Sequence, residues 1–124
     1  MIQVLTIPGN VPTKKNKYRV RGDGKGFFKP PVVKDFEKLV EQELLVQRAR
    51  AITGPIQVSL VLVYGRHEPD LDGSLTTLLD ALQDGGLFPN DRDVRRIHDC
   101  EKRASTSEQS DPPRAIITIE EYAG

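Results

Sequence analysis

The stretch that decides the fold is residues 70–91, which read DLDGSLTTLLDALQDGGLFPND. Its leucines recur at offsets of four, seven, eight and eleven, and this spacing places them on one face of a helix. They are Leu71, Leu75, Leu78, Leu79 and Leu82. Asp72 or Ser74 could cap the start of this helix, and the glycine pair at 85–86 would end it, because glycine adopts positive φ freely. The stretch therefore predicts one amphipathic helix.

Carboxylates stand at both ends of this predicted helix. Asp70 and Asp72 open it, and their side chains lie on the same side if the link into the helix is extended. Asp91 follows a turn whose loop could bring it back beside them. Crowded carboxylates are costly unless a cation neutralises them, and hard oxygen ligands suit Mg²⁺ or Mn²⁺. On these residues alone two explanations stay open: a metal site, or aspartates that act only as caps and loop residues.

The rest of the chain predicts four strands and a second helix. Residues 33–50 have the apolar spacing of a helix, and 56–64 is the strongest strand, with the apolar content of a central one. Further strands are expected at 2–7, 94–104 and 115–122. An α/β (α+β) fold follows, with a mixed sheet and two main helices in a single domain that spans residues 1–124.

Residues 10–31 combine basic side chains with aromatics, glycines and prolines. They predict a β-hairpin in which 17–21 pairs with 26–29 and the aromatics pack inward. The same aromatics, Tyr18, Phe27 and Phe28, could instead stack on unpaired DNA bases. A hairpin and a contact with DNA are compatible.

Charge is distributed unevenly along the chain. The formal net charge is zero, yet residues 1–50 carry 11 Lys or Arg against 5 Asp or Glu, and residues 51–124 carry 7 against 13. Chance could produce this asymmetry, but a local basic surface also attracts phosphate on a neutral protein. The side chains expected to contact DNA phosphates are Lys14, Lys15, Lys17, Arg19, Arg95 and Arg96.

The aspartates belong to a longer pattern with a known counterpart. Six positions match without a gap: Asp70, Asp72, Asp80, Ala81, Leu82 and Asp91. This spacing resembles the motif Asp-x-Asp-Asn-x-x-Lys-x-x-x-Asp-Ala-Leu, followed by an Asp-Asp pair, of the RusA family of Holliday junction resolvases. The opening segment 9–15, GNVPTKK, is similar to that family as well. Three positions depart from the motif: Gly73 replaces its Asn, Thr76 its Lys, and Asn90 the first Asp of the pair.

The resemblance implies a Mg²⁺-dependent endonuclease, with Mn²⁺ as the alternative ion, that resolves four-way junctions in recombination and repair. It implies that Asp70, Asp72 and Asp91 hold the metal and carry the catalysis. It also implies a homodimer, because a junction of approximate two-fold symmetry requires two matched nicks. The lysine that the family uses in cleavage is absent at Thr76, and we expect Lys14, Lys15 or Arg95, in that order, to replace it.

Two other functions stay open. The changes at Gly73 and Thr76 are consistent with a module that binds branched DNA and cuts it slowly or not at all. A metal-dependent nuclease for another DNA structure would keep the chemistry and change the substrate. Incubation with a synthetic four-way junction and Mg²⁺ separates these functions, because paired symmetric nicks indicate the resolvase and binding without nicks indicates the module.

The sequence also bears on where the protein works. It contains no apolar run of the roughly 18 residues that a membrane helix needs, and the start of the chain lacks the pattern of a signal peptide. Its single cysteine, Cys100, excludes an internal disulfide framework and suits a reducing compartment. We therefore expect a cytoplasmic protein that does not bind membranes.

Overall fold

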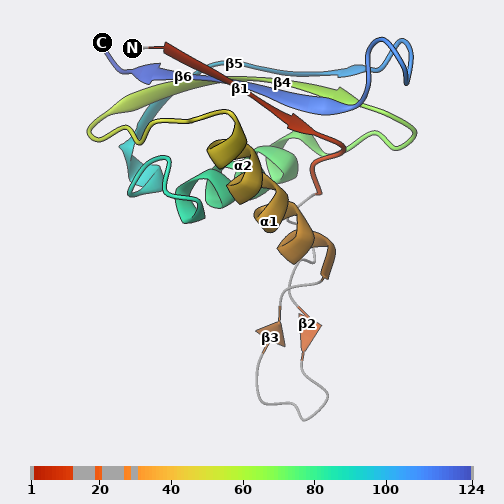
Figure 1. Cartoon of the computed structure of the whole chain (residues 1–124), viewed down its shortest axis with the longest axis horizontal. Coiled ribbons are helices and arrows are strands. Elements are labelled where there is room, and N and C mark those ends of the chain that lie inside the picture. Colours follow the sequence, from red (N-terminus) through yellow and green to blue (C-terminus); the bar gives the residue numbers. More distant parts are fainter. Residues whose placement is uncertain (1, 13–18, 21–26, 29–30, 124) are drawn as a thin grey trace.

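The protein consists of one mixed four-stranded sheet with two helices packed against one of its faces (Figure 1). The computed structural model describes residues 2–12, 19–20, 27–28 and 31–123. The strands stand in the order β1-β6-β4-β5, with antiparallel pairing from β1 to β4 and parallel pairing between β4 and β5. Their bounds are β1 Ile2–Pro8, β4 Ile56–Tyr64, β5 Val94–Ala104 and β6 Arg114–Glu121. The predicted fold class is confirmed.

Strand β4 is the centre of the sheet, as its apolar sequence predicted. Its side chains alternate between the buried face under the helices and the opposite face, and only Val63 breaks the alternation by being buried on that opposite face. Leu60 lies between Ile117 of β6 and Cys100 of β5 in the register. Because β5 is parallel to β4, the carboxyl ends of both strands, at Tyr64 and Ala104, lie at the same end of the sheet.

Helix α2, Leu71–Asp84, is the helix predicted from the leucine spacing. Asp70 is its N-cap, with extended backbone (φ −78°, ψ 117°), and the Asp70 carbonyl accepts a hydrogen bond from the Ser74 amide at 2.9 Å. The predicted caps Asp72 and Ser74 are therefore wrong, because both lie inside the helix. The predicted end is confirmed, since Gly86 has a φ of +88°.

Helix α1, Pro31–Val46, differs from the predicted range of 33–50 at both ends. It starts earlier because proline suits the first turn, where its missing N–H is not needed. It ends earlier because Arg48 takes a left-handed conformation (φ 54°). The Gln47 side chain then bonds both the amide and the carbonyl of Thr6, at 3.0 and 2.6 Å, and so covers part of the outer edge of β1. Val46, the last residue of α1, is 75% exposed, although it continues the apolar spacing that predicted the helix.

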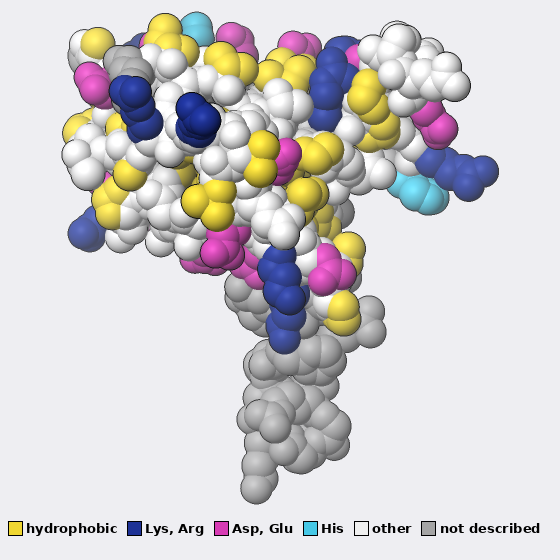
Figure 2. Space-filling view, in the orientation of Figure 1, with side chains coloured by type: hydrophobic (Ala, Val, Ile, Leu, Met, Phe, Trp, Pro, Cys, Tyr) yellow, Lys and Arg dark blue, Asp and Glu magenta, His cyan; other side chains and the backbone are white. Residues whose placement is uncertain are grey.

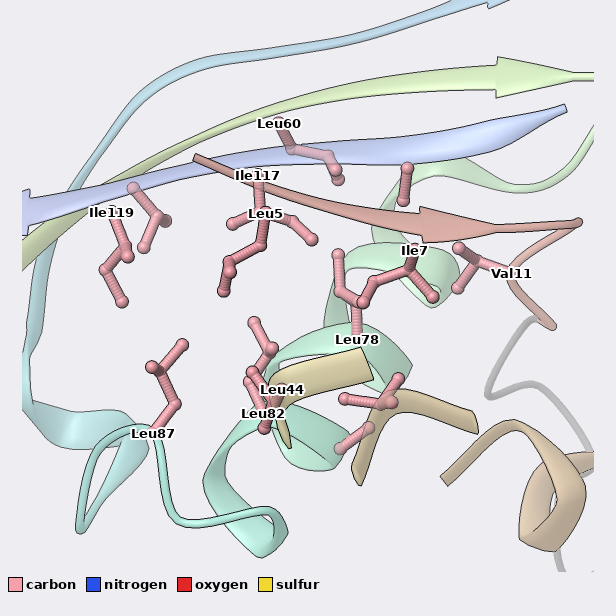
Figure 3. Close-up of a cluster of buried hydrophobic side chains, with 14 of the residues drawn as sticks. Leu5, Ile7, Val11, Leu44, Leu60, Leu78, Leu82, Leu87, Ile117 and Ile119 are labelled. Carbon is pink, nitrogen blue, oxygen red and sulfur yellow. The ribbon is translucent and has the colours of Figure 1, made fainter. Parts of the chain in front are cut away.

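The core lies between the sheet and the two helices (Figure 3). Three strands and both helices contribute side chains that are almost fully buried. They include Leu5 and Ile7 of β1, Leu60 of β4, Ile117 and Ile119 of β6, Leu44 of α1, and Leu78 and Leu82 of α2. Leu87 and Phe88 are also buried, so the turn that follows α2 is anchored to the same core.

Two short strands form a separate pair, shown below α1 in Figure 1. β2, Arg19–Val20, and β3, Phe27–Phe28, pair antiparallel, with Arg19 opposite Phe28. The predicted hairpin is confirmed for these residues.

Two smaller predictions concern Cys100 and the membrane. The Cys100 thiol is half-buried, and burial raises its pKa. Within the described ranges, the structure contains no helix of the length and apolarity that crossing a bilayer requires.

Candidate functional site

Asp70 and Asp72 lie at the carboxyl end of the central strand. The chain leaves β4 after Tyr64, crosses residues 65–69 and enters α2 at Asp70. One carboxylate oxygen of Asp70, Oδ2, is buried. Asp72 is exposed in the first turn of α2, where its Oδ1 accepts a hydrogen bond from the Gly73 amide at 2.9 Å. The structure therefore places these two carboxylates at one end of the sheet, one at the surface and one partly below it.

The segment that follows β1 lies against this end of the sheet. The Ser74 hydroxyl, in the first turns of α2, donates to the Val11 carbonyl at 3.3 Å. The Gly65 amide donates to Asn10 Oδ1 at 3.4 Å, and the Gly9 amide donates to the Pro113 carbonyl at 2.9 Å. The chain that leads to the predicted DNA-binding lysines thus begins beside the aspartate pair. Those lysines, Lys14, Lys15 and Lys17, lie outside the described residues, as does the side chain of Arg19.

Lys102 of β5 reaches the same end of the sheet, a position that was not predicted from the sequence. Its ammonium donates to the carbonyl of Pro69 at 2.9 Å and lies 3.5 Å from Glu68 Oε1. The Tyr64 hydroxyl donates to that same Glu68 oxygen at 3.3 Å. The link between β4 and Asp70 is therefore held by a side chain from the neighbouring strand. The only signal in the sequence was the position of Lys102 within a predicted strand.

Asp111 organises the loop between β5 and β6, which lies beside the link. Its carboxylate, 13% exposed, accepts two hydrogen bonds from Arg103 at 2.7 and 3.0 Å and one from Arg114 at 2.8 Å. The Thr106 amide and hydroxyl also donate to it, each at 3.0 Å. The bonds from Arg103, and then those from Thr106 and Arg114, hold the pKa of Asp111 well below its usual range.

An open groove of about 580 Å³ lies between this loop and the start of the β4–α2 link. Its lining is polar and includes one exposed guanidinium, that of Arg66, which the sequence did not predict as a site residue. The lining residues are Gly65, Arg66, Ser105, Thr106, Ser107 and Glu108. The groove therefore adds a basic side chain and several hydroxyls to the end of the sheet that carries the aspartate pair.

The hydrogen bonds that Asp111 accepts from Arg103, Thr106 and Arg114, here called the Asp111 clamp, lead to a prediction on stability. We expect Asp111→Asn to lower the Tm at pH 7 by several degrees, because an amide cannot accept the charge-assisted bonds from both arginines. Folding depresses the pKa of Asp111, so its contribution is present above the ordinary aspartate pKa of about 3.9 and is lost as the pH falls below that value. The difference in Tm between wild type and variant should narrow between about pH 5 and pH 2.

Thermal unfolding followed by circular dichroism across this pH range checks the prediction. The control is Glu108→Gln on the same loop, an exposed carboxylate whose removal should change the Tm little at any pH. A difference for Asp111→Asn that is constant with pH would contradict this account of the clamp.

Asp91 lies at the opposite end of the sheet from Asp70 and Asp72. It begins the short helix η1, Asp91–Asp93, and its amide donates to Gln83 Oε1 at 3.0 Å. Gln83 is eleven residues beyond Asp72, about 16 Å along the helix. The predicted return of Asp91 to the other two aspartates is therefore not seen within one chain. Among the described residues, no three His, Cys, Asp or Glu side chains gather in a set that could hold a metal ion.

The parallel pairing of β4 and β5 explains this separation. Val94, which begins β5, is opposite Ile56, which begins β4. Asp91 immediately precedes that start, whereas Asp70 follows the end of β4. The two ends of β4 are about 26 Å apart at the usual rise of a strand. The expectation assumed a loop that folds back, but a parallel strand must begin at the amino end of its neighbour.

Arg95 and Arg96 lie at the same end of the sheet as Asp91. Both are exposed near the start of β5, and the Arg96 guanidinium stands 5.1 Å from the centre of the Tyr122 ring. Arg95 is therefore remote from Asp72 of its own chain, and within one chain it does not stand where the missing lysine would. Thr76 occupies the lysine position itself, and its hydroxyl donates to the Asp72 carbonyl at 2.9 Å.

The described basic side chains do not gather in one place on the face that carries β1 and α1. Figure 2 shows the described Lys and Arg side chains spread over that face, with acidic side chains between them. The uneven charge of the two halves of the sequence therefore produces no single basic surface among the described residues in this view. The segment with the highest density of bases, residues 13–18, falls outside the described ranges.

Comparison with known proteins gives two matches. Residues 8–120 match the family described as Endodeoxyribonuclease RusA. A protein of Aquifex aeolicus (strain VF5), named Crossover junction endodeoxyribonuclease RusA, is 33% identical over 91 residues, which covers 72% of this chain and 71% of that protein. The family match extends from the last residue of β1 nearly to the end of β6, so it includes both helices and every aspartate considered above.

Proposed function

Because this chain belongs to the RusA family of endodeoxyribonucleases, we propose that it resolves four-way (Holliday) junctions in DNA with the help of Mg²⁺. The observation that carries the proposal is the position of Asp70 and Asp72 within the matched region, at the carboxyl end of the central strand. In open α/β sheets, ligands commonly bind outside the carboxyl ends of strands. The relative from Aquifex aeolicus, whose name refers to crossover junctions, supports the choice of substrate.

The donor chemistry of this aspartate pair fits Mg²⁺. Such an ion takes one or two carboxylates from the protein and completes its octahedron with water and phosphate oxygens. Asp70 and Asp72 would hold it, and the exposed Asp72 leaves room for a DNA phosphate. When bound, the ion supplies a water that is nucleophilic at neutral pH and stabilises the leaving oxygen.

Asp91 completes the proposed ligand set from a second copy of the chain. Its separation from Asp70 and Asp72 within one chain is fixed by the parallel pairing of β4 and β5. In a homodimer, however, the amino end of one sheet can lie against the carboxyl end of the other. Two-fold symmetry would then form two equivalent sites, which suits a junction that is cut twice.

We propose that the segment that leads from Val11 to the lysines contacts the DNA backbone and so forms a grip on the DNA. Its start is held against the first turns of α2 by the bond from Ser74 to the Val11 carbonyl. The lysines of this segment, with Arg19, would therefore approach a DNA strand whose scissile phosphate lies at Asp72. Arg95 and Arg96 would contact DNA at the Asp91 end. Contacts of this kind fix the register of the DNA without reading its sequence.

A salt titration tests this grip. We expect Lys14→Ala with Lys15→Ala to make the slope of log K against log salt shallower by about one to two units, since each phosphate contact contributes about −0.9 on duplex DNA. A matched control removes two exposed lysines of α1, with Lys34→Ala and Lys38→Ala, and should leave the slope unchanged. An unchanged slope for the first pair would place the DNA elsewhere.

The proposal as a whole is tested with a synthetic four-way junction of fixed sequence. We expect paired nicks at symmetric positions with Mg²⁺ or Mn²⁺, and none with EDTA. Tight binding without nicks would indicate a branched-DNA-binding module, consistent with Gly73 and Thr76. Equal cleavage of junctions and of flaps or single strands would indicate a nuclease for another DNA structure.

A cytoplasmic location stays a prediction that rests on the single cysteine.

A further inference from the structure

Lys102 lies in the edge strand β5 and points toward the start of α2. It is opposite Leu62 of β4 in the parallel register. Neighbours in register project from the same face of a sheet, and Leu62 is buried under the helices. The Lys102 side chain, 32% exposed, therefore leaves β5 on the helix side and reaches the β4–α2 link across the end of the sheet.

The contact with Pro69 bears directly on Asp70. The Pro69 carbonyl, 2.9 Å from the Lys102 ammonium, belongs to the peptide that joins Pro69 to Asp70. A charge-assisted hydrogen bond to this carbonyl limits rotation of the peptide. Because the φ of proline is already fixed, the direction in which Asp70 enters the helix is then determined. The conformation of Asp70 at that point is extended, and its carbonyl accepts the first bond of α2, from Ser74.

The ion pair with Glu68 does not explain why the lysine is there. Its two groups are 3.5 Å apart and the Glu68 side chain is 59% exposed. Exposed pairs of this kind contribute little to stability. The shorter contact is the one to the Pro69 carbonyl, so that contact, rather than the ion pair, is the reason to assign a role to Lys102.

Thr76, at the motif position that usually carries a lysine, cannot supply a cation of this kind. Thr76 uses its hydroxyl within the helix, as a donor to the Asp72 carbonyl, and it carries no charge. Lys102 instead brings a cation, from a different strand, to the peptide that precedes Asp70. Groups that orient a metal ligand in this way commonly affect metal affinity or activity by about 10- to 100-fold.

We propose that Lys102 is a positioning residue for DNA cleavage, which holds the Pro69–Asp70 peptide so that the Asp70 carboxylate is correctly placed for metal and phosphate. This inference rests on the proposed function. It concerns a residue outside the aspartate motif and outside the basic N-terminal segment.

Four variants of the full chain separate this role from a structural one. Lys102→Met removes the charge and the donor but keeps the aliphatic stem. Lys102→Arg restores both, and Lys102→Gln keeps a donor without the charge. Glu68→Gln removes the ion pair and leaves the bond to Pro69 intact. Each variant is compared with wild type for single-turnover cleavage of the junction, Mn²⁺ affinity by calorimetry, junction binding in EDTA, and Tm.

We expect Lys102→Met to lower both the cleavage rate and the Mn²⁺ affinity by about 10-fold or more, with junction binding in EDTA and Tm close to wild type. Lys102→Arg should recover most of the loss, and Glu68→Gln should behave as wild type. Wild-type rate and Mn²⁺ affinity in Lys102→Met would overturn the proposal, as would an equal loss in Glu68→Gln. If Lys102→Met is unstable, Lys102→Gln takes its place. A cleavage rate and Mn²⁺ affinity below those of Lys102→Arg would support the proposal, and equal values would overturn it.

Amide hydrogen exchange at Ser74 gives a readout that requires no activity. This amide bonds the Asp70 carbonyl, so Lys102→Met should speed its exchange and Glu68→Gln should not. Should the wild-type protein neither nick a junction nor bind Mn²⁺, the proposed function fails, and this measurement still decides whether Lys102 holds the peptide. Unchanged exchange in Lys102→Met would then reject the positioning role by itself.

Discussion

Replacing Asp72 by Asn should abolish Mg²⁺-dependent cleavage while junction binding stays intact or becomes tighter. Metal ions stabilise a transition state for phosphate transfer by several kcal/mol, and each 1.36 kcal/mol is a factor of ten, so we expect a loss of about 10³ or more. Binding should not weaken, because removing a negative charge reduces the repulsion of DNA phosphate.

The local structure around Asp72 should be the same in this variant as in the wild type. Asp72 is exposed, and the bond from the Gly73 amide to its Oδ1 can be kept by the Asn carbonyl oxygen. The fold should therefore persist, apart from a small loss of about 0.3–1 kcal/mol at the helix N-terminus.

Single-turnover cleavage and junction binding in EDTA, measured side by side, check the prediction. The matched control is Asp84→Asn, which makes the same change in an exposed residue at the other end of α2 and should cut normally. Cleavage by Asp72→Asn at the wild-type rate would show that the metal is held elsewhere.

The regular elements could be predicted from the sequence where a pattern was long and closed by a clear signal. Strand β4 is apolar without a break from Leu60 to Tyr64, and α2 has leucines at helical spacing followed by two glycines. The end of α1 had no such signal. Its apolar run continues through Val46, and the chain turns at Arg48, a residue type that rarely takes a left-handed conformation.

The candidate site was predicted only in part, because spacing along the chain does not give strand direction. Asp70 and Asp72 are only two positions apart in the sequence, so any fold places them close together. The place of Asp91 depends on whether β5 runs parallel to β4, which the sequence does not state. Lys102 was missed for the same reason, since its approach to Pro69 follows from that register.

A mixture of two inactive variants should recover activity if the site is shared between two chains. Asp72→Asn and Asp91→Asn are each expected to be inactive as homodimers. In a mixed dimer, one site carries both changes, while the other combines the intact Asp70 and Asp72 of one chain with the intact Asp91 of the partner subunit. One of the two sites is then complete.

The expected size of the recovery follows from symmetry. Random exchange in an equal mixture gives mixed dimers in half of the population, so about a quarter of all sites should be active. The products should be single nicks rather than paired ones, because a mixed dimer has one working site. Differently tagged chains, purified through both tags, raise the active fraction to about half.

The control is a mixture of Asp72→Asn with Asp70→Asn, two changes on the same side of the proposed interface, which should stay inactive in every combination. Recovery in the first mixture and not in the second would assign Asp91 to the opposite subunit. Mixed dimers that are verified by their tags and cut nothing would contradict the shared site. The parallel order of β4 and β5 leaves Asp91 at the opposite end of β4, a strand about 26 Å long, from the aspartates that it is proposed to join, so a second chain is the direct way to bring them together.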